Sequence, residues 1–241
     1  MEQTKNEVDN KLTEKTYKKQ KTKFKNLTKS QKIMIIVNNS ISICLSLFLV
    51  GFFIYIMSIG DPNNRMVSCI CTFLLYLAPI ILQWLFKIRI TPTVVSIYLV
   101  FITISAFCGS CLRFNTFIPF LDKIQHTTWG YIAGLIGLFY LCKTKEIDTL
   151  KPFTVIVVFF AISMATASIW EIIEFTGDTF LGQTAQGHPD VNGVVDVTDT
   201  MLDMIVHLCG TLIFTLHYCL DRFTHKNLGI TSIINDFKIK Y

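Results

Sequence analysis

Acidic and imidazole side chains recur at helical spacing between Asp196 and Gly210. Asp196, Asp199, Asp203 and His207 are three or four residues apart, so a helix of 3.6 residues per turn places them on one stripe. Such a stripe within a membrane is costly unless its groups pair, bind a cation or face water. The spacing therefore predicts a polar site on this helix.

Two earlier segments carry the same residue types. Asp122 and His126 are four residues apart, and Glu171 and Glu174 are three apart. Measured at 1.5 Å per residue, Asp122, Glu171 and Asp203 each lie about 30 Å from the basic residues at the other end of their own segments. We therefore expect three helices to present these groups at one depth, in the outer leaflet.

The candidate ligand- or cation-binding residues share this depth; they are Asp122, His126, Glu171, Glu174, Asp199, Asp203 and His207. Arg113 and Lys123 are near enough in sequence to neutralise one carboxylate each. The carboxylates left over must protonate, separate into water or bind a cation. Taken singly, Asp196 is more simply explained as a helix N-cap, and each histidine is more often a hydrogen-bonded core residue than a ligand.

Mixed carboxylate and imidazole ligands on facing helices are typical of Mn, Fe or Zn. A divalent metal would use His126, His207, Glu171 and Asp203, with Glu171 and Asp203 as the catalytic candidates. The sequence contains no HExxH motif, and the ExxE at 171–174 lacks the ExxH of di-iron bundles. Without a metal, the same groups would bind a cationic or sugar headgroup.

The composition is that of a multi-pass membrane protein. Hydrophobic residues make up 51% of the chain and charged residues only 16%, against about 25% in soluble domains. Without the period-two pattern of a barrel, an all-α fold with about six transmembrane helices is expected. The apolar segments are roughly 33–58, 66–86, 92–112, 124–142, 152–175 and 200–220.

The basic residues set the expected orientation and domains. Residues 1–32 hold ten Lys and four acidic residues, and the connections after the second, fourth and sixth segments are also basic. The positive-inside rule therefore predicts both termini inside. We expect a basic cytoplasmic tail at 1–32, a membrane domain at 33–220 with an outer Gly-rich loop at 176–198, and a cytoplasmic C-terminal tail at 221–241. The N-terminal tail is expected to touch anionic lipid rather than nucleic acid.

Small residues and cysteines raise two further questions. Gly130 and Gly134 form a GxxxG spacing that permits close helix packing, within one chain or between two. Four cysteines lie near the outer ends of the second and third segments: Cys69, Cys71, Cys108 and Cys111. We expect them to be small apolar residues that fill space between the helices. A disulfide at the outer end is the alternative, and a cysteine-ligated metal is the least favoured one.

Three short motifs occur in a recognisable order. They are a D-x-x-x-H at Asp122, a W-E-x-x-E at Trp170 and a D-T-x-x-D-x6-G from Asp199 to Gly210. Over about residues 115–220 the chain resembles the VanZ-like membrane proteins, and more closely a related group of uncharacterised bacterial membrane-spanning proteins. VanZ-like proteins are associated with teicoplanin resistance, so the resemblance implies a role in the cell envelope but supplies no reaction. The chain lacks an Arg shortly before Asp199 and has Asp203 where Asn is common, which puts antibiotic resistance in doubt.

The sequence thus predicts a multi-pass protein of the cell membrane that binds a headgroup, peptide or cation at an outer acidic and histidine site. The first alternative is a metal-dependent membrane hydrolase or transferase acting on a lipid-linked substrate. A proton-coupled transporter is a weaker alternative, because transporter acids usually lie nearer the midplane. The sequence leaves the oligomeric state open.

Overall fold

The computed structural model describes residues 27–61, 65–144, 147–186, 197–224 and 226–238, and this part consists of helices and their connections, without strands. In chain order the elements are α2 (Lys29–Ser58), α3 (Met66–Leu85), α4 (Pro92–Ile102), the π-helix η1 (Thr103–Cys111), α5 (Phe114–Phe117), α6 (Leu121–Thr144), the 3-10 turn η2 (Ile147–Thr149), α7 (Pro152–Leu181), α8 (Thr198–Thr224) and α9 (Ile230–Lys238). Residues 1–26 of the expected basic tail at 1–32 lie outside the described residues, and the end of that tail already belongs to α2. The all-α prediction is confirmed.

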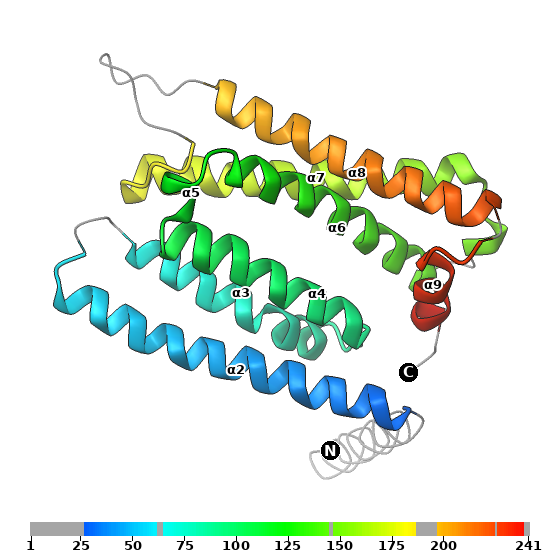
Figure 1. Ribbon diagram of the computed structural model, residues 1–241, viewed down its shortest axis with the longest axis horizontal. Coiled ribbons are helices and arrows are strands. Elements are labelled where there is room, and N and C mark those ends of the chain that lie inside the picture. The colour runs from blue at the N-terminus through cyan, green and yellow to red at the C-terminus, as the bar shows by residue number, and fades with distance from the viewer. Residues whose placement is uncertain (1–26, 62–64, 145–146, 187–196, 225, 239–241) are drawn as a thin grey trace, which may run out of the picture.

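The helices form two groups, which Figure 1 shows as two layers. Helices α2, α3 and α4 with η1 share one apolar core, which includes Leu49, Tyr76 and Leu99. Helices α6, α7, α8 and α9 share a second core, which includes Phe159 and Phe214. Each group therefore has its own packed interior, and the space between them belongs to neither.

Five helical stretches are long and apolar enough to span a membrane. They are α2, α3, the continuous run of α4 and η1 from Pro92 to Cys111, α7 and α8. The remaining expected span, the fourth at 124–142, corresponds to α6, which has 24 residues and is about 36 Å long. Polar residues such as Lys123 and Gln125 lower its hydropathy, which is tolerated because α6 contacts both α7 and α8 and buries ten residues. The chain is a polytopic helical membrane protein.

Several helix boundaries follow from local sequence. Pro92 and Pro152 begin α4 and α7, where a missing backbone N–H costs nothing. Helix α7 continues to Leu181, through residues that we expected to belong to the 176–198 loop. It ends where Gly182 adopts a φ of +63°. Residues 187–196 of that loop, including Asp190, lie outside the described residues.

Glycines bring α6 and α8 into close contact. A Cβ atom added to Gly130 would overlap the carbonyl oxygen of His207, and one added to Gly210 would overlap the carbonyl oxygen of Thr127. Gly134 in turn faces the ring of Phe214. The GxxxG spacing therefore serves packing within the chain, which was one of the two expected uses.

The ends of the bundle differ in charge. We call the end where α6 and α8 begin the site end; it lies at the left of Figure 1. The opposite end carries the basic residues that flank the helices, among them Lys87, Lys143, Lys151 and Arg222. From this distribution the positive-inside rule predicts that the opposite end lies on the inner side of the membrane. The orientation itself stays a prediction.

The C-terminal segment contains a helix that the sequence did not predict. α9 buries Ile230, Ile234 and Phe237 against α6 and α8. The carboxylate of Asp221 accepts hydrogen bonds from the backbone N–H groups of Leu228, Ile230 and Thr231, at 2.8 to 3.1 Å. The expected cytoplasmic tail at 221–241 is therefore partly a docked amphipathic helix.

The cysteines are all free thiols. Cys69 and Cys111 are buried between α3 and η1, where the Thr72 hydroxyl lies 3.4 Å from Cys111 Sγ. Cys71 and Cys108 are not buried. For Cys69 and Cys111, this is the environment of small apolar filler residues.

Candidate acidic and histidine site

Lys123 is the centre of the polar cluster at the site end. Its Nζ atom lies 2.5 Å from Asp199 Oδ1, 2.8 Å from both carboxylate oxygens of Asp203 and 3.1 Å from Asp122 Oδ2. Asp122 and Lys123 belong to the first turn of α6, and Asp199 and Asp203 to the first turns of α8. We call Asp122, Lys123, His126, Asp199 and Asp203 the acidic cluster.

This arrangement corrects the sequence-based view of Lys123. We expected it to neutralise one carboxylate, and it contacts three. The reason is the close packing of α6 on α8, which brings two aspartates of α8 within reach of one flexible side chain from α6. The cluster still contains two more carboxylates than ammonium groups.

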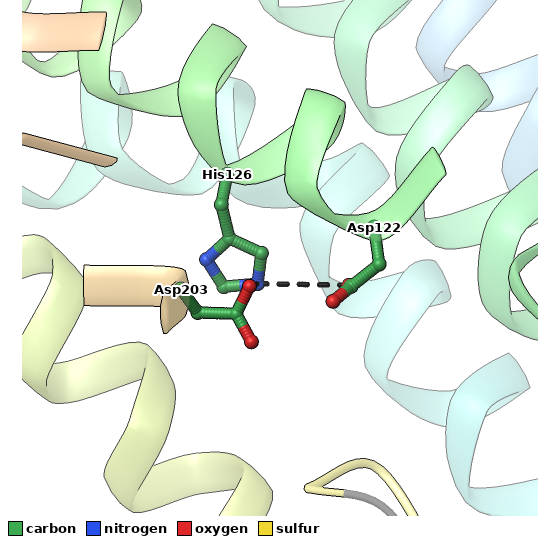
Figure 2. Close-up of side chains that lie close together, drawn as sticks. All are labelled: Asp122, His126 and Asp203. Carbon is green, nitrogen blue, oxygen red and sulfur yellow. Dashed lines mark ion pairs between the residues drawn. The ribbon is translucent and has the colours of Figure 1, made fainter. Parts of the chain in front are cut away.

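His126 joins the cluster from one turn along α6. Its Nε2 atom lies 3.7 Å from Asp122 Oδ1 and 3.7 Å from Asp203 Oδ1. Figure 2 shows the His126 ring and the two carboxylates directed toward a common point between α6 and α8. One ligand atom from each of these three residues lies within 4.8 Å of the others. Of the four expected metal ligands, His126 and Asp203 belong to this group, and Glu171 and His207 lie outside it.

His207 is buried one turn below Asp203 on the same face of α8. Its side chain is 0% exposed, and neither ring nitrogen makes a hydrogen bond of good geometry within the described residues, although the backbone of Ser163 lies close to the ring. Buried polar groups in native proteins usually have a partner. The His207 imidazole is therefore a buried polar group on the wall of a cavity.

The two glutamates of α7 occupy different environments. Glu171 is buried with its Oε2 atom unpartnered in the described structure. Glu174 accepts a 2.7 Å hydrogen bond from Trp170 Nε1. The W-E-x-x-E motif thus fixes one carboxylate by the indole of the same motif and leaves an oxygen of the other available.

The turn after α7 is tied to the start of α8. Asp178 accepts hydrogen bonds from the N–H groups of Ala185 at 2.7 Å and Gln186 at 2.9 Å. The Gln186 side chain then donates to Thr200 Oγ1 at 2.8 Å. The threonine of the D-T-x-x-D motif therefore has a positioning role. Asp196, the expected N-cap of this helix, lies outside the described residues.

A cavity of about 510 Å³ lies between the two helix groups and reaches the site end. Its walls are apolar along α3, α4 and most of α6. At the site end they become polar, with lining residues Asn115, Asp122, Gln125, His126, Trp170, Glu174 and His207. The described residues that line the cavity include two carboxylates and two imidazoles but no Lys or Arg.

Sequence reasoning missed the partners that complete this polar end. Gln125 is buried and exchanges side-chain hydrogen bonds with Asn115, at 3.0 and 3.3 Å. Trp129 packs on Phe101 across the gap between the helix groups, with ring centroids 5.2 Å apart. The only signal in the sequence was that Gln125 is the neighbour of His126. The sequence around Gln125 does not show which other helix will pack against it.

The fold is that of a multi-pass helical membrane protein, and a cluster of acidic and histidine side chains lies at one end of its bundle. Residues 41–223 match the family described as "Predicted membrane protein (DUF2238)", and the chain belongs to this family. The match covers the expected resemblance region and extends into the first helix group. The relation to VanZ-like proteins stays a prediction.

One relative and the solved structures complete the comparison. A Thermotoga maritima protein titled "Uncharacterized protein" is 32% identical over 102 residues, which are 42% of this chain and 49% of that protein. The chain thus matches about half the length of that relative. No solved structure matches the chain.

Proposed function

We propose that this chain binds a cation at the polar end of the cavity, in the outer leaflet of the cell membrane. The observation that carries the proposal is the charge of the site. Asp122 and Glu174 face a cavity whose described lining includes two histidines but no Lys or Arg. A positive ligand would offset the charge of Glu174 and the part of the carboxylate charge that Lys123, shared among three aspartates, leaves uncompensated. In an environment less polar than water this attraction is stronger than at a protein surface.

The acidic cluster supports the proposal from the adjacent side. Lys123 already places one ammonium group among three carboxylates, and this contact supports a cation at this position. The remaining carboxylate excess makes a second cation favourable. Asp122 and His126 belong to both the cluster and the cavity wall, so they are the residues through which a cavity ligand would contact the cluster.

A positive ligand has two chemical sources, an organic ammonium group or a metal ion. Tetramethylammonium and Mn²⁺, added separately to the purified protein in nanodiscs, represent them. A ligand that binds only the folded protein raises the unfolding temperature. We expect at least one probe to raise it for the wild type and to lose most of that effect in Asp122→Asn.

The matched control is Asp148→Asn, which removes a carboxylate at the opposite end of the bundle. It should retain the wild-type response to either probe. A wild-type protein that responds to neither probe, or an Asp122→Asn protein that responds as the wild type does, would contradict the proposal. A response to Mn²⁺ alone identifies a metal ion, and a response to tetramethylammonium alone identifies an organic cation.

A metal-dependent hydrolase or transferase acting on a lipid-linked substrate is the second candidate. The observation that favours it is the convergence of Asp122, His126 and Asp203 within 4.8 Å, because catalytic zinc sites use three protein ligands and leave a position open. Lys123 holds both oxygens of Asp203, so it would have to move for the metal to bind there.

Metal content separates this candidate from an organic-cation site. A stoichiometric metal that is lost in His126→Ala and kept in His217→Ala, the matched histidine on α8, supports the enzyme. A metal-free protein whose phenotype survives both His126→Ala and His207→Ala would exclude it. The transporter alternative predicts that solute uptake depends on Glu171; uptake unchanged in Glu171→Gln would argue against it.

A further inference from the structure

We infer that the occupant of the cavity is a lipid-like amphiphile whose positively charged head lies against Asp122 and Glu174 and whose hydrocarbon chain fills the apolar part between the helix groups. The inference rests on the proposed cation site and names the molecule that carries the charge. It starts from the shape of the cavity, which a free metal ion or a small cation does not explain.

The cavity is long as well as apolar. On α6 its lining extends from Asp122 to Phe139, a separation of 17 residues or about 25 Å along the helix. This is most of the ~30 Å thickness of the hydrocarbon core of a bilayer. A volume of about 510 Å³ distributed over such a length fits an extended chain better than a compact molecule.

The cavity walls are apolar along most of their length and polar at the site end, as an amphiphile has an apolar chain and a polar head. Leu75, Leu82 and Val95 represent the apolar walls contributed by α3 and α4, and Ile136 represents those of α6. The carboxylates and imidazoles are confined to the site end. Ligand pockets are commonly apolar with a few polar groups that fix the orientation of the ligand. An amphiphile therefore fits with its head at the site end and its chain toward the opposite end, where each part meets a wall of matching polarity.

Charge selects the class of headgroup. The described lining offers Asp122 and Glu174 and lacks Lys or Arg, so a sulfate or phosphate head would be repelled. Two indoles lie at this end, on Trp129 and Trp170. Because Trp170 donates its N–H to Glu174, its ring position is coupled to one of the two carboxylates. Aromatic faces also attract ammonium groups.

Tryptophan quenching tests the inference directly. The chain has three tryptophans, and Trp84, which is 79% exposed, is outside the cavity lining. In a Trp84→Phe background the remaining two line the cavity. Probes brominated in the chain, added at low mole fraction to unbrominated vesicles, should quench them when bound. The probes are hexadecyltrimethylammonium, hexadecyl glucoside and hexadecyl sulfate, with butyltrimethylammonium as the short-chain comparison.

We expect saturable quenching by the hexadecyl cation, at least tenfold tighter than by the butyl cation and the hexadecyl sulfate. Ala78→Trp, measured by displacement of a radiolabelled probe, fills the apolar part and should weaken binding at least tenfold. Ala161→Trp on the exposed face of α7 is the matched control and should bind as the wild type does. Ala78→Phe, a smaller change, replaces Ala78→Trp if the latter does not fold.

The outcomes separate the inference from the proposed function. If tetramethylammonium or Mn²⁺ binds and hexadecyl and butyl cations bind equally, the inference is overturned and the cation site stands. If the three hexadecyl probes bind equally whatever their headgroup, the preference for a cation is overturned in both the inference and the proposed function. If no probe binds the folded protein, both proposals are overturned.

Discussion

Lys123 Nζ lies 2.8 Å from each of the two carboxylate oxygens of Asp203. Asp203 is 1% exposed, so its charge is withdrawn from water and depends on this ammonium group. Removing one member of a buried pair typically costs about 3–5 kcal/mol, because the other charge is left uncompensated. The pair therefore links the stability of the α6–α8 contact to the charge state of the site.

Lys123→Met should make the protein less stable and more responsive to cations. The substitution keeps most of the side-chain length but leaves three carboxylates without their ammonium partner. We expect the unfolding temperature to fall without a ligand, and the affinity for tetramethylammonium or Mn²⁺ to rise about tenfold, or about 1.4 kcal/mol. Thermal unfolding and titration of the purified variant measure both effects. An affinity equal to that of the wild type would show that Lys123 does not compete with the ligand.

Gly210→Ala should separate α6 from α8 and weaken the site. The added Cβ would overlap the backbone oxygen of Thr127, which has no freedom to rotate away. Overpacking of this kind costs typically about 1–3 kcal/mol. The matched control is Gly51→Ala on α2, where an added Cβ meets nothing within 4 Å. Equal unfolding temperatures for the two variants would argue that the close α6–α8 contact is absent.

The sequence predicts the depth of the polar residues, because rise along a helix is a local property. Asp122, His126 and Asp203 lie at one end as expected, and three of their ligand atoms converge. What local spacing does not contain is the rotation of one helix against another. The three contacts of Lys123 and the cavity lining depend on that rotation, so neither could be predicted.

Two other differences between the expected and the observed structure, the end of α7 and the presence of α9, also depend on features that local spacing does not contain. Helix α7 runs to Leu181 because Gly182, rather than Gly177, supplies the left-handed residue that ends it. Helix α9 forms from a short segment whose apolar residues gain burial only against α6 and α8. Asp221 reaches its backbone N–H groups across a turn, which is a tertiary feature rather than a sequence motif.

The docking of α9 should depend on pH through Asp148. Arg222 Nη2 lies 2.9 Å from Asp148 Oδ1, and Lys238 of α9 pairs with the other oxygen. The hydrogen bond from Lys238 is the main cause that lowers the pKa of Asp148 below its usual value. Because the pKa of Asp148 is lower in the folded protein, its carboxylate stabilises the fold at pH values above the unfolded pKa of about 3.9. This stabilisation is lost as the pH falls from there through the folded pKa.

Comparison of the wild type with Asp148→Asn isolates that contribution. At pH 7 we expect the variant to be less stable by under about 1 kcal/mol, since exposed ion pairs contribute little. The difference in unfolding temperature should shrink toward zero as the pH is lowered from 5 to 3. A difference that stays constant over this range would mean that Asp148 acts through its shape rather than its charge.

The orientation can be tested without purified protein. The basic residues at the opposite end predict that the site end faces outward. A reporter that is active only outside, fused at position 190 between α7 and α8, should be active. One fused after position 146, between α6 and α7, should be inactive. The reverse pattern would place the acidic cluster at the inner surface and contradict an outer-leaflet site.

Calorimetric titration tests the central claim most directly, because it counts sites as well as measuring affinity. Tetramethylammonium and Mn²⁺ are titrated separately into the protein in nanodiscs at pH 7. We predict one saturable site per chain for at least one of them, weakened about tenfold in Asp122→Asn and unchanged in Asp148→Asn. The absence of saturable binding for both cations in the wild type would contradict the account.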